Sequence, residues 1–360
     1  MTEESLLQLL QSCAARAPEP LYPAIFAKDE SVDRDQLDVA LEELRRRGLL
    51  KLTDWVKDLG QGYAPTAAGL NALTAQRLPT ARATTIEMDA PSGISHYERG
   101  EIVRRAVFAP TSPYVSWVLL AANLLYFAVG AAYGGYHDQS VSDYLQGKGV
   151  ATNRVLIDLG ALHPVLVFAD RYIPNERPQF ERILLSCFLH VGLLHLLMNM
   201  YFLYNMAPII ESMWGSLRFL MIYAIAGIVS GCMILLISLI ENLPPLETPL
   251  TAGASGCLFG IFVALAVWFW LNREHLPQGV IQDFSRSLGI NAVLLIAISF
   301  VPGVSWQAHL GGAGGGLLAA LLLHVNRFHP SAAMRMLAIA GLPAIPIGFF
   351  MIVLWQAKYF

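Results

Sequence analysis

The sequence predicts an all-α polytopic membrane protein that carries a small α+β domain at its amino end. Of its 360 residues, 55% are hydrophobic and only 14% are charged, whereas about a quarter of a soluble domain is charged. The chain also divides sharply, because residues 1–110 are polar and residues 114–357 alternate long apolar runs with short polar loops. Its formal net charge of −3 and its four scattered cysteines lead us to expect no metal site, no cofactor and no disulfide framework.

The front domain, residues 1–80, shows elements that follow from periodicity. Residues 31–50 carry apolar side chains at helical spacing, and Gly48 is a natural stop for that helix. Two short strand-like pieces follow, with a Gly-x-Gly turn expected between them, and a second helix is expected to begin at Pro65 or Thr66. This order, which ends in "Y-x-x-T-x-x-G", resembles winged-helix domains.

Winged-helix domains often bind DNA, but the charge of this one argues against that function. Residues 1–100 hold 11 Lys and Arg against 15 Asp and Glu, whereas a DNA-binding face needs a cationic surface for its phosphate contacts. Basic residues cluster only at Arg45, Arg46, Arg47 and Lys51. We therefore expect a regulatory domain or one that binds a protein partner, with nucleic-acid binding as the alternative. Residues 81–113 are interpreted as a linker and juxtamembrane stretch.

Seven apolar segments are candidates for membrane spans, each of which needs about 20 apolar residues. They lie at residues 114–134, 184–209, 216–240, 252–271, 288–302, 306–326 and 334–356. The first six would form a core over residues 114–326, with a long outer loop at 135–183. The seventh would lie in the remaining segment, 327–360.

Basic residues gather in alternate loops of this predicted core. They are Arg99, Arg104, Arg105, Arg218, Arg273, Arg286, Arg327 and Arg335, while the loops "ENLPPLETPL" and "VPGVS" contain no Lys or Arg. Because positively charged loops stay in the cytoplasm, we expect a cytoplasmic amino terminus and an external carboxyl terminus. A bacterial plasma membrane fits best, since no signal or transit peptide is visible.

Polar side chains within the spans are functional candidates, because burying them in lipid without a partner is costly. In the second span, "LHVGLLHLLMNMYFLYN", His190 is followed by His195 and Asn199, which share a helix face. The fourth span opens with Ser255 in "GASG", and in the sixth span His309 precedes five glycines. If those glycines bring the two helices together, Ser255 and His309 come within hydrogen-bond reach, which is the minimum for an activated serine. The structural alternative is close helix packing and interhelical hydrogen bonding.

Three motifs in these spans match one family. They are H-x-x-x-x-H-x-x-x-N (His190, His195, Asn199), G-x-S-G (Gly253, Ser255, Gly256) and A-H-x-x-G-x-x-x-G (Ala308, His309, Gly312, Gly316). In this order and spacing they resemble the rhomboid intramembrane serine proteases over residues 180–326. The seventh span resembles the six-plus-one arrangement of some members.

The resemblance implies a role for each matching residue. Ser255 would be the nucleophile, and His309 the general base and then the acid. The oxyanion hole would use the Ser255 backbone N–H with the side chains of His195 and Asn199, while His190 would be structural. Further supporting positions are Gly253, Gly256, Phe259 and Gly312, and the family also implies the turn motif E-x-x-x-G (Glu211, Gly215) and the arginine of a W-R pair (Arg182).

Two departures from the family pattern bear on rate and substrate access. Glu181 replaces the tryptophan of the W-R pair, and Phe259 replaces a tyrosine whose ring packs on the catalytic histidine. A phenyl ring can still stack, so neither departure removes a group that the Ser–His mechanism requires.

The resemblance implies transmembrane protein substrates, cleaved within the lipid bilayer through an acyl-enzyme. Three other functions compete with this one. A transporter would show internal inverted repeats, and no convincing one is visible in the sequence. A catalytically inactive rhomboid-like protein that binds membrane proteins, and a membrane-tethered regulator, are the remaining alternatives.

Overall fold

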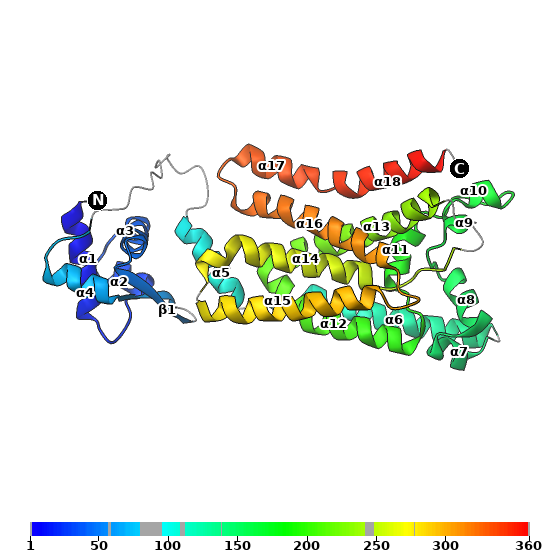
Figure 1. Cartoon of the computed structure of the whole chain (residues 1–360), viewed down its shortest axis with the longest axis horizontal. Coiled ribbons are helices and arrows are strands. Elements are labelled where there is room, and N and C mark those ends of the chain that lie inside the picture. Colours follow the sequence, from blue (N-terminus) through cyan, green and yellow to red (C-terminus); the bar gives the residue numbers. More distant parts are fainter. Residues whose placement is uncertain are drawn as a thin grey trace. The chain divides into compact units, whose positions relative to one another are not determined.

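The computed structural model describes residues 2–56, 59–79, 96–108, 112–137, 139–241, 248–276 and 278–358. The chain separates into two compact units, of which the first comprises residues 1–110 and 272–284 and the second comprises residues 111–271 and 285–360 (Figure 1). The expected linker at residues 81–113 lies partly outside the described residues. Within its described part, residues 96–108 form a helix.

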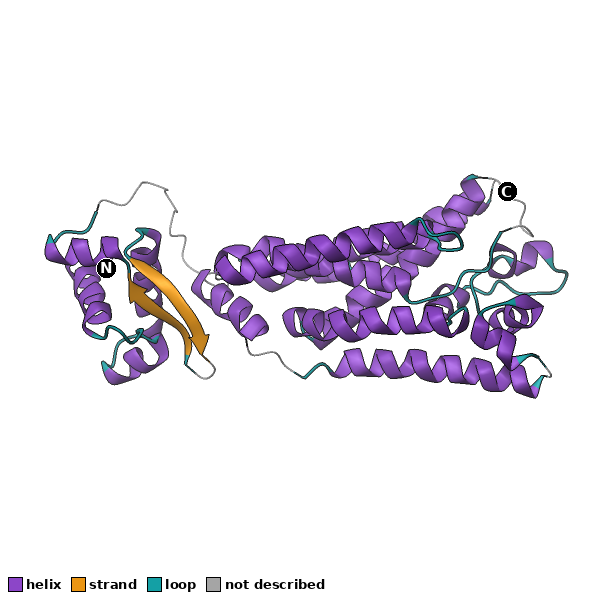
Figure 2. Cartoon of the chain, turned by 60° about the horizontal axis from the view of Figure 1, so that its bottom comes forward, coloured by secondary structure: helices purple, strands orange, loops and turns teal. Residues whose placement is uncertain are grey.

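The first unit is a small α+β structure built from short helices and one antiparallel hairpin (Figure 2). Its elements are α1 (Glu3–Ala15), α2 (Pro23–Asp29), α3 (Arg34–Arg46), β1 (Leu50–Val56), β2 (Gly60–Pro65), α4 (Ala67–Thr74), α5 (His96–Phe108) and η3 (Arg273–His275). Leucines of α1 and α3 form the centre of its core with Leu21, Leu49 and Tyr63. This architecture fits the expected α+β domain, while the winged-helix assignment stays a prediction.

The predicted end of one helix and start of another in this unit are confirmed, but the predicted hairpin turn is not. Gly48 follows α3 with φ +75°, and Thr66 caps α4 by accepting the N–H of Gly69 at 3.0 Å. The Gly-x-Gly turn is wrong, because Gly60 and Gly62 lie within β2. A Cβ at Gly62 would clash with the side chain of Thr53, so this glycine permits close packing on β1.

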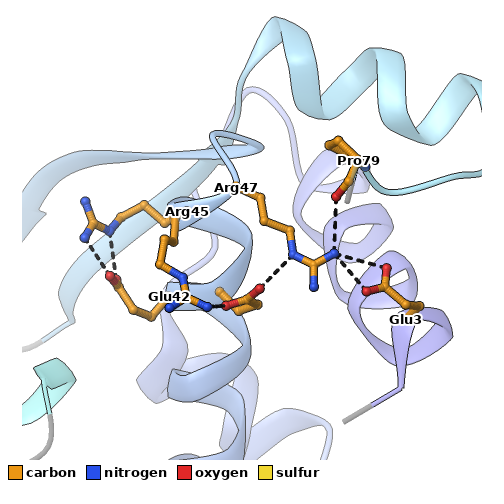
Figure 3. A network of polar contacts seen from close by, with 7 residues as sticks. Glu3, Glu42, Arg45, Arg47 and Pro79 are labelled. Carbon is orange, nitrogen blue, oxygen red and sulfur yellow. Dashed lines mark hydrogen bonds and ion pairs between the residues drawn. The ribbon is translucent and has the colours of Figure 1, made fainter. Parts of the chain in front are cut away.

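Each of the three consecutive arginines at the end of α3 forms an ion pair with a carboxylate. Arg45 binds Glu42 at 2.6 Å, Arg46 binds Glu43, and Arg47 bridges Glu43 at 2.7 Å and Glu3 at 2.9 Å. Figure 3 shows this network, in which Arg47 also contacts the carbonyl of Pro79. Each guanidinium of this cluster is thus paired with a carboxylate, and the expectation against nucleic-acid binding stays a prediction.

The regular elements in the described part of the second unit are helices, apart from one isolated β-bridge, and the protein is an integral multi-pass membrane protein. Among the residues that the structure describes, seven helices are long and apolar enough to cross a bilayer, as predicted. They are α6 (Tyr114–Tyr136), α12 (Gly192–Trp214), α13 (Ser216–Ile240), α14 (Ser255–Asn272), α15 (Gln278–Ser299), α16 (Trp306–Phe328) and the pair α17 (Ala332–Gly341) and α18 (Ala344–Ala357).

Two predicted span boundaries are wrong. The second span was expected from residue 184, but α12 begins at Gly192, whose φ of +80° breaks the helix from α11 (Arg182–Leu185) and η1 (Ser186–Phe188). His190 therefore precedes the helix rather than lying on it. The fifth span, expected from residue 288, begins ten residues earlier, because polar residues such as Gln282 and Asp283 continue the helix.

The long loop after α6 folds into short helices, and one of its residues pairs with the segment that precedes α14. They are α7 (Val141–Gln146), α8 (Gly149–Asp158), α9 (Pro164–Val167) and α10 (Ala169–Tyr172). Leu162 and Thr251 exchange two backbone hydrogen bonds of 2.9 Å. Buried Arg182 donates to the carbonyls of Ile157 and Ala161 at 2.8 and 3.0 Å. These contacts anchor the loop beside the segment that precedes Ser255.

Candidate active site

The helices that carry Ser255 and His309 touch backbone to backbone. A Cβ at Gly312 of α16 would clash with the backbone of Gly256 on α14, and a Cβ at Gly316 would clash with the backbone of Gly260. Side chains larger than hydrogen would force the helices apart, since close approach of this kind requires small residues. The predicted contact between the fourth and sixth spans is therefore confirmed.

Ser255 is the first residue of α14 and is half-buried. It follows a turn that requires glycine, because Gly253 has φ +135° and a Cβ there would lie 2.8 Å from Cε1 of His195. The N–H of Gly253 donates to the carbonyl of Ser186 at 2.9 Å, which fixes the turn. The first N–H groups of a helix have no partner within the helix, and Ser255 lies at that position in α14.

His309 lies buried in the first turn of α16, against the face of α14 that carries Ser255. The rings of His309 and Phe259 stack with centroids 4.0 Å apart at 11°. Because Phe259 follows Ser255 by one helical turn, the two share a face of α14. The expectation that a phenyl ring can replace the family tyrosine in this stack is confirmed.

The second contact of His309 is one that the sequence analysis missed. Its Nδ1 lies 2.7 Å from the Oγ of Ser299, near the end of α15. The only signal in the sequence is a single polar residue in the apolar run "LLIAISF", which does not indicate a partner. No hydrogen bond joins Ser255 to His309 within the described parts of the chain, and such catalytic contacts are often long before substrate binds.

His195 presents one edge of its ring to the turn before Ser255. Its Nδ1 accepts the backbone N–H of Val191 at 3.3 Å, so in the neutral ring the proton lies on Nε2. That nitrogen would lie 2.9 Å from a Cβ at Gly253. Buried Asn199 donates one amide hydrogen to the carbonyl of His195 at 2.9 Å and carries a second one. His195 thus directs a donor at the turn before Ser255, and Asn199 is joined to it through the His195 carbonyl.

His190 lies fully buried before α12, and its ring centroid is 5.3 Å from that of His195. Glu211 lies at the far end of α12, where it accepts the backbone N–H groups of Val115 and Ser116 at 3.0 and 2.7 Å. Both match family positions, but neither contacts Ser255 or His309 directly. No group of three or more His, Cys, Asp or Glu side chains in the described ranges is arranged to hold a metal ion.

An apolar groove opens between α12 and α15. Its cavity volume is about 480 Å³, and its lining residues are Leu197, Met198, Tyr201, Phe202, Leu294 and Ile298. Ile298 is adjacent in sequence to Ser299, which contacts His309. The groove and the Ser299 contact thus share α15, although none of the lining residues is itself a candidate site residue.

Comparison with known proteins identifies the family. The Rhomboid domain model matches residues 177–326. The rhomboid protease GluP of Bacillus subtilis is 28% identical over 250 residues, which cover 68% of this chain and 41% of GluP. A second Bacillus subtilis relative, YdcA, is 31% identical over 145 residues, which cover 40% of this chain and 67% of YdcA. Inactive rhomboid protein 1 of Danio rerio is 28% identical over 148 residues, or 41% of this chain and 16% of that protein. This chain thus spans well under half of GluP, although it covers two thirds of YdcA, and it belongs to the rhomboid family.

Proposed function

We propose that this protein is an intramembrane serine endopeptidase that cleaves transmembrane segments of other membrane proteins. The observation that carries the proposal is the glycine contact of α14 and α16, which brings the Ser255 face of α14 against His309 through the Phe259 stack. A serine at a helix start, on the helix face that packs on a buried imidazole, supports nucleophilic acyl transfer.

The proposed reaction uses groups of this chain alone. Ser255 Oγ attacks the scissile carbonyl carbon while His309 takes its proton. The resulting oxyanion accepts hydrogen bonds from the Ser255 backbone N–H, His195 and Asn199. The intermediate expels the amine, which takes the proton from His309, and leaves an acyl-enzyme. Water then attacks the ester with His309 as base, which releases the acid and restores the serine.

Substrate would approach through the groove between α12 and α15, whose apolar lining suits a transmembrane helix. The carbonyls of a helix are engaged in hydrogen bonds, so the scissile segment must unwind first. We therefore expect a preference for Gly, Ala or Pro near the outer end of the substrate helix.

The first test is labelling of the detergent-purified protein with a fluorescent fluorophosphonate, which reacts with activated serines. Ser255→Ala and His309→Ala are expected to abolish labelling. Asn199→Ala should lower the rate by roughly 10²–10³-fold, as loss of one oxyanion donor does. The matched control is Ser287→Ala, which removes an exposed hydroxyl on α15 and should label normally.

The alternative is a catalytically inactive rhomboid-like protein that binds membrane proteins, or a membrane-tethered regulator. The Danio rerio relative is named as an inactive rhomboid, and His309 is hydrogen-bonded to Ser299 rather than to Ser255 in the structure. A folded wild-type protein that resists the probe would favour this alternative, whereas Ser255→Ala protein that still reacts with the probe would show that Ser255 is not the nucleophile.

A further inference from the structure

Ser299 has a hydrogen-bond pattern that determines the proton position on His309. Its Oγ donates to the carbonyl of Leu295 at 2.9 Å, one turn earlier on α15. A hydroxyl has a single hydrogen to donate, so it can serve the Leu295 carbonyl or His309 but not both. With that hydrogen on the carbonyl of Leu295, Ser299 Oγ accepts in the 2.7 Å contact with Nδ1 of His309, and Nδ1 carries the proton.

This protonation state has a direct chemical consequence. A neutral imidazole holds one proton, so a ring protonated on Nδ1 has its lone pair on Nε2. A general base needs that lone pair directed at the nucleophile, and a partner on the other nitrogen ensures the correct tautomer in other serine hydrolases. We propose that Ser299 is a positioning residue that holds His309 in the tautomer competent to deprotonate Ser255.

The inference rests on the proposed function and deepens it by adding a third member to the Ser–His pair. Ser299 acts through His309 and is not a catalytic residue itself. When His309 takes the proton of Ser255, the imidazolium forms a charge-assisted hydrogen bond to Ser299. The contact is thus stronger in the charged state than in the neutral one, so it favours proton transfer as well as orientation.

The surroundings of His309 contain few other charges that would produce the same effect. Within the described residues, α14 presents Ser255 and Phe259, and α13 meets α16 through Val229, Ser230 and Met233. The other titratable group that interacts with His309 is His195 of α12. Because His195 is not altered in the variants below, differences between them report on Ser299.

The test compares fluorophosphonate labelling of the full-length protein carrying Ser299→Ala, Ser299→Thr or Ser287→Ala over a range of pH. Loss of one neutral hydrogen bond should slow labelling of Ser299→Ala about tenfold. Its acid limb should also move to lower pH, because the protonated ring loses an acceptor. Ser299→Thr retains a hydroxyl that can bond the carbonyl one turn earlier and should restore both the rate and the profile, and Ser287→Ala should match wild type. Wild-type rate and profile in Ser299→Ala would overturn the inference.

A spectroscopic measurement separates this inference from the proposed function. Nitrogen NMR of full-length protein with ¹⁵N-labelled histidine, assigned by difference from His309→Gln, reports the protonated ring nitrogen without any need for activity. A proton on Nδ1 in wild type that becomes shared between both nitrogens in Ser299→Ala supports the inference even if no probe reacts. A proton on Nε2 of His309 in the wild type would overturn it.

Discussion

At the scale of single residues, the polar groups inside the membrane-spanning unit hold the ends of helices together. Glu211 is fully buried, yet its carboxylate accepts two backbone N–H groups at the start of α6 and the hydroxyls of Ser116 and Ser216 at 2.6 and 2.5 Å. The carboxylate thus caps a neighbouring helix whose first N–H groups have no partner of their own. The family motif at this position therefore has a structural reason in this chain.

Replacing Glu211 by Ala should destabilise the protein by about 2 kcal/mol or more, because charge-assisted hydrogen bonds are lost and buried donors remain unsatisfied. Thermal unfolding of the purified protein in detergent measures the effect. Glu241→Ala, at the exposed end of α13, is the matched control and should change the midpoint little. Equal midpoints for the two variants would show that the cap contributes nothing.

At the scale of elements, the site depends on how closely α14 and α16 approach. The glycines of α16 differ in the space around them, because those that face a neighbouring helix leave no room for a side chain. Gly312 faces the backbone of Gly256, whereas a Cβ at Gly314 would meet nothing within 4 Å. One helix thus provides both a substitution that should disrupt the site and one that should not.

Gly312→Ala is expected to lower the thermal midpoint and to reduce fluorophosphonate labelling, because the added methyl group forces the helices apart at a cost of about 1–3 kcal/mol. Gly314→Ala should leave labelling unchanged and raise stability by up to about 1 kcal/mol, since alanine is the better helix former. If both substitutions reduced labelling equally, helix propensity or another general effect would be the cause, and not the contact.

The seventh span is an element whose packing the sequence did not indicate. Its second part, α18, packs on α13 and on the loop helices, with the rings of Phe350 and Phe180 5.0 Å apart in an edge-to-face arrangement. Arg171 of α10 donates to the carbonyl of Ala357 at the end of α18. The end of the seventh span is thus joined to the loop that pairs with Thr251 near Ser255.

At the scale of the whole molecule, the two units differ in the interactions that stabilise them. Most of the described ion pairs lie in the first unit, whereas the membrane-spanning unit depends on apolar packing and helix caps. Desolvation raises the pKa of Glu43, but hydrogen bonds from Arg47 and Arg46 outweigh it and lower the pKa below the ordinary 4.5. Stability from this group is therefore fully present above pH 4.5 and is lost as the pH falls through the lowered value.

Acidification should accordingly open the first unit before the second. Hydrogen exchange of the full-length protein is expected to lose protection in α1 and α3 below pH 4.5, while amides of α13 stay protected. Glu43→Gln should show the same loss already at neutral pH, and Glu30→Gln, whose exposed pair with Arg16 is long at 3.9 Å, is the matched control. Simultaneous loss of protection in both units would contradict this view.

The sequence by itself determined the membrane class, the number of spans and the family, because apolar length and motif spacing are properties of the chain. It also predicts the residues of the candidate site, which stay a prediction. Only the tertiary structure decided that α12 starts after His190 and that Glu211 caps α6. The sequence also did not predict that Ser299 contacts His309. Ser299 lies on another helix, and a single serine in an apolar run does not indicate which residue it faces. Contacts between helices depend on rotation and separation, which spacing along one helix does not specify.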